Sequence, residues 1–208
     1  MLPTMIVFDL DDCLWSPEMY TLHAIPSIPE HGDLTPARIS RPTNTNTPST
    51  MRGVVGMQVP PNGPTVRLFT GARQVLYELA TDPKYQGIIL AAASSSEEPT
   101  YSAACLESIE VLPGLTLRQM IHFDQIGRTG PLAPNKQTHF RLLHQESKIA
   151  FEEMLFFDDC NWGDHCATVT REFGVVSYRT PRGLQYSEFQ QALDKYRTQA
   201  EERGAAGR

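Results

Sequence analysis

Two aspartates two positions apart, Asp9 and Asp11, follow directly on the apolar run at residues 5–8. A continuous apolar run is typical of a strand buried on both faces, and side-chain direction repeats every second residue, so both carboxylates would point the same way. Neighbouring carboxylates repel each other and lose hydration, and a fold retains them with a cation or a shared proton. A hard cation such as Mg²⁺, which prefers oxygen ligands, would resolve this conflict. The alternative is that the acids only cap the strand and begin a turn.

A serine and a lysine further along the chain could bind an anion. Ser94 ends the small-residue run at 87–93, and its hydroxyl, with backbone N–H groups of the next turn and helix, would form an anion site. Lys136 stands at the start of a predicted helix, where its charge opposes the helix dipole unless an anion lies nearby. The alternatives are a serine that caps a helix and a solvated surface lysine.

A second pair of acids, Asp158 and Asp159, closes the apolar run at residues 154–157. Carboxylates at the end of another buried strand suit the same hard cation, because Mg²⁺ in proteins uses one or two carboxylates and keeps several waters. Cys160, His165 and Cys166 follow in the sequence, but their spacing fits no common zinc site.

The elements that must position these groups alternate between strands and helices. Apolar runs predict strands at 5–8, 87–93, 153–157 and 173–178, and helical patterns predict helices at 71–80, 101–109, 136–147 and 184–196, with either a short strand or a helix end at 117–123. This alternation is typical of a parallel sheet wrapped by helices. In such folds the chemistry lies at the carboxyl ends of the strands, where Asp9, Ser94 and Asp158 are all expected.

An irregular, proline-rich insert separates the first strand from the helix at 71–80, and it occupies residues 16–64. Residues 54–59 and 65–69 have strand composition on either side of a Pro/Gly turn, which predicts a β-hairpin flap near the mouth of the site. We expect residues 42–50, which are polar and contain proline, to form an exposed, mobile loop.

The segment 8–15, Phe-Asp-Leu-Asp-Asp-Cys-Leu-Trp, resembles the first motif of the haloacid dehalogenase (HAD) superfamily, Asp-x-Asp-x-Thr/Val-Leu. Its final Leu-Trp is similar to the magnesium-dependent phosphatase-1 family in particular. The resemblance implies that Asp9 is the nucleophile and that Asp11 is the general acid/base. Cys13 stands where Thr is common, which is a supporting position rather than a reacting one.

The other motifs of the superfamily follow in order. Ser94 resembles the second motif, whose Ser or Thr holds the transferring phosphoryl group. Ser95 and the next serine stand where the phosphatase-1 family usually has Arg-Thr, so Ser95 is expected at the phosphate without the bidentate donor of an arginine. Lys136, before Thr-His-Phe at 138–140, resembles the third motif, whose Lys steadies the nucleophile and the phosphoryl oxygens.

Residues 156–159, Phe-Phe-Asp-Asp, resemble the fourth motif, which anchors Mg²⁺. Asp158 is expected to bind the metal, and Asp159 to bind it either directly or through water. Family members often continue with an acid and an Asn, so either Asn161 or Asp164 could supply an outer contact. The complete expected metal set is Asp9, Asp11, Asp158 and Asp159.

The resemblance covers nearly the whole chain and implies an α/β, Rossmann-like HAD fold. We expect a single domain over residues 1–200, with a small flap insert at about 16–69 in place of a full cap domain, and a flexible tail at 201–208. The expected catalytic residues are Asp9, Asp11 and Lys136, and the expected phosphate-binding residues are Ser94, Ser95 and Lys136.

The function implied is a Mg²⁺-dependent phosphatase that hydrolyses phosphate monoesters through an aspartyl-phosphate intermediate. A short flap leaves the site open, so the substrate is either a phosphoprotein side chain such as phosphotyrosine or a small sugar phosphate. The alternatives are another HAD phosphotransfer role and a catalytically silent phospho-ligand binding protein, although the presence of both Asp9 and Asp11 argues against the silent protein. A receiver-type signalling domain is disfavoured because its acid pair and its phosphorylated Asp lie on separate strands.

Composition restricts the partners and the compartment. The formal net charge of −6 argues against a nucleic-acid partner, no apolar run approaches the roughly 20 residues that span a bilayer, and the N-terminus lacks the basic start of a signal peptide. The four cysteines have no disulfide-framework spacing, which favours a reducing setting. We therefore expect a cytoplasmic enzyme whose partner is a phosphorylated substrate, with no nucleic acid and no membrane; the sequence leaves the oligomeric state open.

Overall fold

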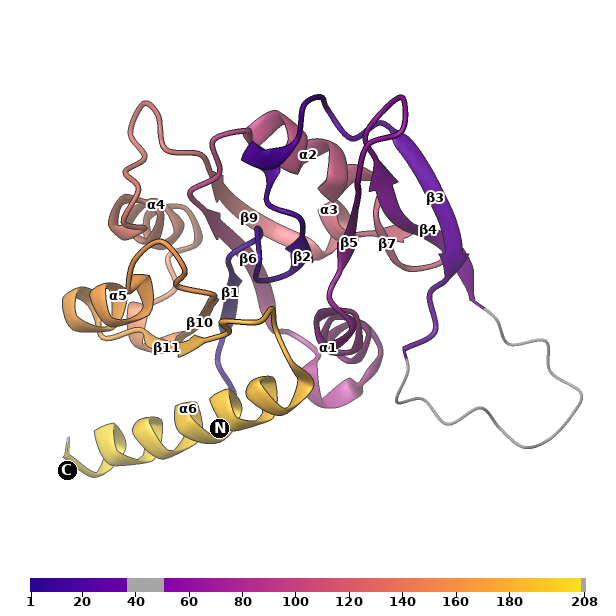
Figure 1. Cartoon of the computed structure of the whole chain (residues 1–208). Coiled ribbons are helices and arrows are strands. Elements are labelled where there is room, and N and C mark those ends of the chain that lie inside the picture. Colours follow the sequence, from indigo (N-terminus) through magenta and orange to yellow (C-terminus); the bar gives the residue numbers. More distant parts are fainter. Residues whose placement is uncertain (37–50, 207–208) are drawn as a thin grey trace, which may run out of the picture.

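Five parallel strands form the central sheet of the protein. The computed structural model describes residues 1–36 and 51–206, and its main sheet has the order β11-β10-β1-β6-β9 (Figure 1). The strands are β1 (Met5–Phe8), β6 (Ile89–Ser94), β9 (Ile121–Ile126), β10 (Met154–Asp158) and β11 (Val176–Arg179). Four of them match the predicted apolar runs, and the ambiguous segment at 117–123 contains a short helix, α3 (Leu117–Met120), followed by β9. The predicted α/β fold with a parallel sheet is confirmed.

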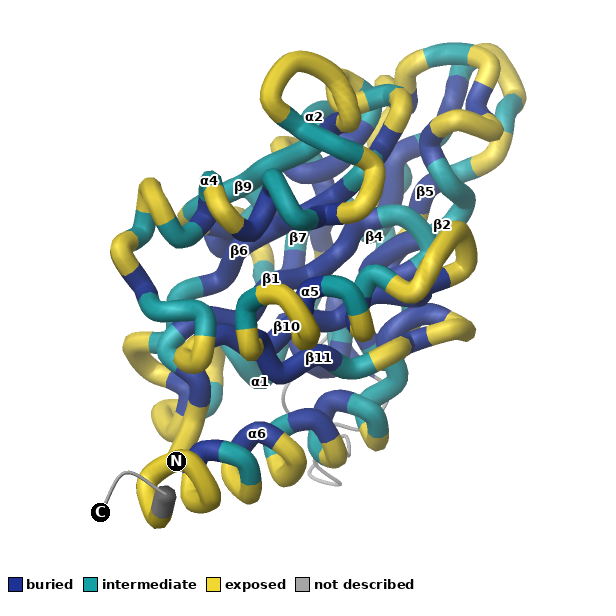
Figure 2. Tube along the Cα trace, turned by 90° about the vertical axis from the view of Figure 1, so that its left-hand side faces the viewer, coloured by how far each residue is buried: buried dark blue, intermediate teal, exposed yellow. Residues whose placement is uncertain are grey.

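Helices cover both faces of this sheet, so β1 is buried on both sides. Met5 and Val7 pack in one apolar layer, and Ile6 and Phe8 pack in the other. The helices of the first layer are α4 (Gln137–Ser147) and α5 (His165–Phe173), and those of the second are α1 (Thr70–Thr81) and α6 (Tyr186–Ala206). Figure 2 shows the buried strands in the middle and helices whose exposed sides face outward. A strand in this position needs a continuous apolar run.

The helices α5 and α4 begin in different ways. α5, which was not predicted, begins after Asp164, whose carboxylate accepts a hydrogen bond from Ala167 N at 2.9 Å, and it ends at Gly174, where φ is 75°. α4 begins after Lys136, whose φ is 66°. Non-glycine residues seldom adopt a positive φ, so the backbone at Lys136 is held by its surroundings.

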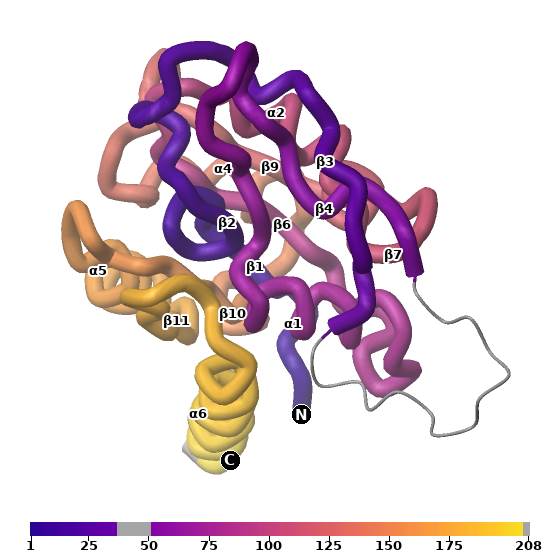
Figure 3. Tube along the Cα trace, turned by 45° about the vertical axis from the view of Figure 1, so that its right-hand side comes forward, coloured from indigo at the N-terminus to yellow at the C-terminus, as the bar shows by residue number. Residues whose placement is uncertain are grey.

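The insert after β1 folds as a four-stranded antiparallel sheet of order β2-β5-β4-β3 (Figure 3). Its strands are β2 (Trp15–Ser16), β3 (Ile28–Asp33), β4 (Arg52–Gln58) and β5 (Thr65–Leu68). β4 and β5 form the predicted hairpin, in which Met57 pairs with Val66. The insert is therefore small, as expected, but it has two strands more than the hairpin alone.

β3 is the outer strand of this insert, and the sequence did not predict it. It contains Pro29 and Gly32 and has no alternation of apolar side chains, which are features that argue against a central strand. An edge strand tolerates proline because one side of its backbone has no partner strand. At its far end Asp33 pairs with Arg52 of β4.

The hairpin packs on the flank of the molecule, against α1 and β7 (Glu110–Leu112). Val54 N donates a hydrogen bond to Glu110 Oε2 at 2.6 Å. Arg73 of α1 donates to Val55 O at 3.3 Å. The side chains of Glu110 and Arg73 thus connect β4 to β7 and to α1.

The remaining elements are short connections and the final helix. They include α2 (Pro99–Ser108), β8 (Leu115–Thr116), η1 (Met19–Thr21), η2 (Pro83–Tyr85) and η3 (Phe151–Glu153). α6 continues to Ala206, so it includes residues 201–206 of the expected tail; the residues after Tyr196 are mostly good helix formers. The loop expected at 42–50 lies outside the described residues. In the described part of the chain, no helix is long and apolar enough to cross a membrane.

Candidate active site

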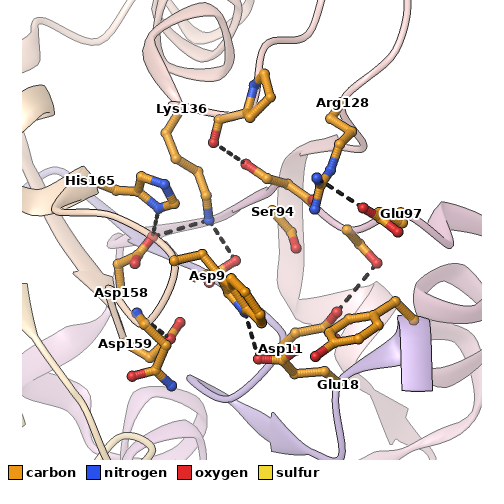
Figure 4. A pocket seen from close by; sticks show the side chains of 16 residues that line it. Asp9, Asp11, Glu18, Ser94, Glu97, Arg128, Lys136, Asp158, Asp159 and His165 are labelled. Carbon is orange, nitrogen blue, oxygen red and sulfur yellow. Dashed lines mark hydrogen bonds and ion pairs between the residues drawn. The ribbon is translucent and has the colours of Figure 1, made fainter. Parts of the chain in front are cut away.

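The carboxyl ends of three neighbouring strands meet at one end of the central sheet. Phe8 of β1 pairs with Phe157 of β10 and with Ala92 of β6, so the residues that follow these strands come together. A pocket of about 450 Å³ opens at this point (Figure 4). It is lined by every residue predicted for the site, namely Asp9, Asp11, Ser94, Ser95, Lys136, Asp158 and Asp159, together with Glu18, Tyr20, Ser96, Glu97, Arg128, Pro134, Asn161, Trp162 and His165.

Three buried carboxylates in this pocket form a group that could hold a metal ion. One oxygen from each of Asp9, Asp158 and Asp159 lies within 4.8 Å of the other two. Three carboxylates buried together repel one another, and a divalent cation that prefers oxygen ligands fits this donor set. The group contains no cysteine and no histidine.

Lys136 is buried beside these acids, with only 1% of its surface exposed. Its Nζ lies 2.6 Å from Asp9 Oδ1 and 3.1 Å from Asp158 Oδ2, and it donates a hydrogen bond to Ala93 O at 2.8 Å. The ammonium group therefore has one hydrogen bond to the backbone and two ion pairs with buried carboxylates. Although burial lowers it, the two carboxylates raise the pKa of Lys136 above its usual value, and the lysine stays charged.

Asp158 is the acid whose ionised form is best supported. Burial raises its pKa, but Lys136 and His165 outweigh that effect and hold the pKa of Asp158 well below its usual value. Cys160 N donates to Asp158 Oδ1 at 2.8 Å, and His165 Nδ1 lies 3.3 Å from Asp158 Oδ2. Asp158 therefore presents a fixed, ionised carboxylate to the pocket.

Asp9 and Asp159 are the two acids of this group whose pKa values are raised. Burial raises the pKa of Asp9, although the charge of Lys136 opposes this effect. Burial, together with the charges of Asp9 and Asp158, raises the pKa of Asp159 to about 8. A bound cation would favour the ionised form of both residues, because it adds positive charge where the carboxylates crowd.

Asp11 lines the pocket outside the three-acid group. Its Oδ1 accepts a hydrogen bond from Trp15 Nε1 at 2.7 Å, and its Oδ2 accepts from Met19 N at 3.2 Å and from Ser96 Oγ at 3.3 Å. Burial raises the pKa of Asp11 to about 6, the charge of Asp9 adds to this effect, and the Trp15 bond opposes it. The expectation that the Asp9 and Asp11 carboxylates point the same way assumed that one strand runs through both residues. β1 ends before Asp9, so the Asp11 carboxylate turns toward the insert.

The two serines predicted at the phosphate have different environments. The carbonyl oxygen of Ser94 lies 3.1 Å from Nε2 of His139, a buried residue of α4 that also contacts Gly127 O at 2.9 Å. No protein partner for the Ser94 hydroxyl is found among the described residues, so this hydroxyl is available to a ligand. Ser95 Oγ donates to Pro134 O at 2.9 Å, so the loop before α4 already engages it.

Of the two residues expected to supply an outer contact to the metal, Asn161 lines the pocket and Asp164 does not. Asn161 N donates to Asp159 Oδ2 at 2.8 Å and so orients that carboxylate. The Asp164 carboxylate instead caps α5 through Ala167 N.

The rim of the pocket contains aromatic and acidic side chains that the sequence did not predict. Trp162 Nε1 donates to Glu18 Oε1 at 3.0 Å, and the rings of Tyr20 and Trp162 pack edge to face at 6.1 Å. Within the described residues, no part of β4 or β5 lines the pocket, so the predicted hairpin forms none of its wall. The start of the insert, around η1, takes that place. An exposed tryptophan shortly after Asp159 is the signal that could have indicated this rim.

His165 and Arg128 also line the pocket without having been predicted. His165 was considered only as a zinc ligand, and it contacts a carboxylate instead. Arg128 lies in a Gly/Pro loop after β9, where the sequence has no periodic pattern, and its Nε donates to Ser95 O at 3.0 Å.

The chain is similar to several known proteins. A family model described as Acid Phosphatase matches residues 1–199. The chain is 27% identical over 157 residues to an HAD-like hydrolase superfamily protein of Schizosaccharomyces pombe, and the match covers 76% of each protein. Among solved structures it is similar to the N-terminal part of BF1531 from Bacteroides fragilis, which contains a phosphatase domain complexed with Mg, with 18% identity and a TM-score of 0.54 over 92% of this chain and 40% of that one. The chain is also similar to CbbY from Rhodobacter sphaeroides in complex with phosphate, with 15% identity and a TM-score of 0.49 over 85% of each chain.

Proposed function

The chain belongs to the acid phosphatase family and to the HAD superfamily, and on this basis we propose that it hydrolyses phosphate monoesters with Mg²⁺ through an aspartyl-phosphate on Asp9. Membership of the family makes the protein a phosphatase; the metal, the intermediate and the substrate belong to the proposal. One observation carries it. The Asp9 carboxylate faces the buried Lys136 ammonium at 2.6 Å and shares a buried group with Asp158 and Asp159.

Asp9 would act as the nucleophile. An attacking carboxylate must be ionised, and the Lys136 charge supports the ionised form against the effect of burial. Attack on phosphorus forms the Asp9–phosphate bond and breaks the bond to the leaving oxygen, which divides one difficult hydrolysis into two easier steps.

Asp11 would act as the general acid and then as the general base. Its pKa of about 6 makes both the protonated and the ionised form accessible near neutral pH. The protonated carboxyl gives its proton to the leaving oxygen, and the carboxylate then takes a proton from the water that attacks the aspartyl-phosphate. Trp15 and Ser96 hold Asp11 in place for both steps.

The phosphoryl oxygens would be bound by Ser94, Lys136 and backbone N–H groups that follow β6. Asp9, Asp158 and Asp159 would hold Mg²⁺, which when bound neutralises charge on the phosphoryl group. Ser95 can join these donors only if its hydroxyl leaves Pro134 O.

The open rim supports a substrate whose leaving group extends out of the pocket. Trp162 is 75% exposed and Tyr20 is 49% exposed, and together they offer ring surface beside the site. Such a rim suits a phosphotyrosine side chain in a protein, which would make the enzyme a protein tyrosine phosphatase, and a small sugar phosphate is the other substrate class considered. The magnesium-dependent phosphatase-1 family, which residues 8–15 resemble, is the branch that we favour.

The cellular compartment of the enzyme is also part of this proposal. The four cysteines, at positions 13, 105, 160 and 166, are unpaired and buried, which supports a reducing, cytoplasmic environment. The partner is the phosphorylated substrate itself. A catalytically silent binding protein is less well supported, since both Asp9 and Asp11 line the pocket.

Turnover of p-nitrophenyl phosphate, a tyrosine phosphopeptide and a sugar phosphate, each with Mg²⁺ and with EDTA, tests the activity. Asp9→Asn should abolish turnover and should retain or raise the thermal stability, because it removes a buried charge that the neighbouring acids repel. Asp194→Asn, on the exposed side of α6, is the matched control and should retain full turnover. Appreciable Mg²⁺-dependent turnover by pure Asp9→Asn protein would exclude Asp9 as the nucleophile.

A further inference from the structure

Arg128 lies on the wall of the pocket with most of its donors unassigned. Its Nε donates a hydrogen bond to Ser95 O at 3.0 Å, and its terminal nitrogen NH1 forms an ion pair with Glu97 Oε1 at 2.9 Å. The hydrogen bond to Ser95 O holds the guanidinium beside the residue that follows Ser94. In Figure 4 the side chain extends from the loop after β9 to the side of the pocket where Ser94 and Glu97 lie.

Hydrogen-bond donors distinguish the two cationic side chains of this pocket. Within the described residues, Arg128 and Lys136 are the only arginine and lysine that line it. Lys136 has three N–H donors; it donates a hydrogen bond to Ala93 O, and it forms ion pairs with the carboxylates of Asp9 and Asp158. A guanidinium has five N–H donors, of which the contacts with Ser95 and Glu97 account for two. The unused donors of the pocket therefore belong mainly to Arg128.

The charge of the pocket also favours Arg128 as the group that receives a phosphate. Six acidic side chains line it, from Asp9, Asp11, Glu18, Glu97, Asp158 and Asp159. A phosphate monoester carries close to two negative charges at neutral pH and would meet strong repulsion on its way to Asp9. A guanidinium offers a planar pair of donors that matches phosphate oxygens, and such charge-assisted contacts are stronger than neutral hydrogen bonds.

We propose that Arg128 binds the phosphoryl group of the substrate and exchanges Glu97 for it when the substrate enters. This inference rests on the proposed phosphatase function and adds a substrate-binding residue to it. The phosphatase-1 family usually has an arginine directly after the serine of the second motif, where this chain has Ser95. Arg128 would supply an arginine to the pocket from a different loop.

The Glu97 pair can be exchanged at little cost. The side chains of Arg128 and Glu97 are 40% and 53% exposed, and exposed ion pairs contribute little to stability. The anchor from Arg128 Nε to Ser95 O uses a different nitrogen, so it can remain while NH1 changes partner. Glu97 thus acts as a competitor that occupies the guanidinium in the absence of substrate.

This arrangement predicts an effect on binding rather than on the chemical step. Arg128 would hold the phosphoryl group equally in the ground state and the transition state, so its loss should raise KM and leave kcat nearly unchanged. Loss of Glu97 should have the opposite effect on KM, since the guanidinium would then be free. Inorganic phosphate, which needs the same donors, should follow the same order as an inhibitor.

The test compares Arg128→Gln, Arg128→Lys and Glu97→Gln in the full chain, with p-nitrophenyl phosphate as substrate and inorganic phosphate as competitive inhibitor. We expect Arg128→Gln to raise KM and the inhibition constant of phosphate by about tenfold, which is the size of one lost charge-assisted contact. Arg128→Lys should lie between the parent and Arg128→Gln. Glu97→Gln should lower both constants by a few-fold.

Arg141→Gln is the matched control. Arg141 is an exposed arginine of α4 that pairs with Glu172 and does not line the pocket, so both constants should equal those of the parent. Unchanged constants in Arg128→Gln, or a loss confined to kcat, would overturn the proposal. An increase in KM for a phosphopeptide alone, without one for p-nitrophenyl phosphate, would also overturn it, because it would assign Arg128 to the leaving group.

Calorimetric binding of inorganic phosphate separates this inference from the proposed function. If the parent protein binds phosphate but turns over no ester, the proposed function fails, while weaker phosphate binding by Arg128→Gln still supports the inference. Equal phosphate binding by the parent and by Arg128→Gln overturns the inference, whatever the activity.

Discussion

His165 Nδ1 lies 3.3 Å from Asp158 Oδ2, the carboxylate oxygen that Lys136 Nζ also approaches. The other oxygen of Asp158 accepts a hydrogen bond from Cys160 N. The carboxylate is therefore fixed from both oxygens, and His165 is the one participant that comes from the start of α5. Partners that orient a metal ligand in this way commonly affect metal affinity as well as activity.

Replacement of His165 should weaken the metal site. We expect His165→Phe to raise the Mg²⁺ concentration for half-maximal activity by about 10- to 100-fold, because Asp158 loses an orienting donor. His165→Asn places an amide donor near the position of Nδ1 and should recover part of this loss. Calorimetric titration with Mg²⁺ gives a second measurement that does not depend on turnover. The exposed His31 provides the control His31→Asn, which should behave as the parent; equal Mg²⁺ affinity in His165→Phe would assign that histidine a packing role only.

Asp11→Asn should separate the two chemical steps. General acid/base groups contribute roughly 10²–10⁴-fold to a rate, so we expect kcat to fall by that factor. p-Nitrophenol leaves without much help from an acid, so the first step should survive and release a burst of product close to one equivalent per enzyme. Stopped-flow absorbance measures the burst. Asp12→Asn is the control, because Asp12 has a positive φ of 52° that asparagine tolerates and it does not line the pocket. A variant with full kcat would remove Asp11 from the mechanism.

Removal of divalent cations should abolish turnover. Asp9, Asp158 and Asp159 offer only oxygen ligands, which Mg²⁺ and Ca²⁺ both accept. Ca²⁺ takes more ligands at longer distances, and an Asp9 bound through both oxygens would lose its line of attack. We therefore expect EDTA to stop the reaction, Mg²⁺ to restore it, and Ca²⁺ to restore only a small part. Equal rates with the two ions would count against a nucleophile beside the metal.

The buried His139 should make stability depend on pH in a defined range. Burial, with the charge of Lys136, lowers the pKa of His139 to about 4, although its contacts with the carbonyl oxygens of Gly127 and Ser94 oppose this. In the unfolded chain the pKa is about 6.5. Between these values the unfolded state binds the proton and the folded state does not, so the free energy of unfolding falls as the pH falls from about 6.5 to about 4. It should then fall no further on account of this residue.

His139→Gln tests that prediction, because the amide can still donate to both carbonyl oxygens and does not titrate. Denaturant unfolding across this range should show the parent losing stability relative to the variant by at most roughly 1.4 kcal/mol per pH unit, the limit for one proton. Above pH 7 the difference between the two proteins should be constant. Parallel curves over the whole range would mean that His139 has an ordinary pKa in the folded protein.

The sequence was informative where side-chain chemistry coincided with a regular strand. Asp9, Ser94 and Asp158 each follow or end an apolar run, and the carboxyl ends of parallel strands meet, so their meeting was predictable. Arg128 and Trp162 lie in loops, where neither periodicity nor composition shows which way a side chain points. β3 was missed for a different reason, since strand signals are weakest in a proline-containing edge strand.

The pairing of Asp33 with Arg52 at the end of β3 and β4 has a consequence for protein engineering. The backbone enters and leaves the segment between them at two residues that the strand ladder already aligns, and neither lines the pocket. Each doubling of a flexible connection costs only about 0.6 kcal/mol, so a reporter domain could be spliced in at this point with little penalty.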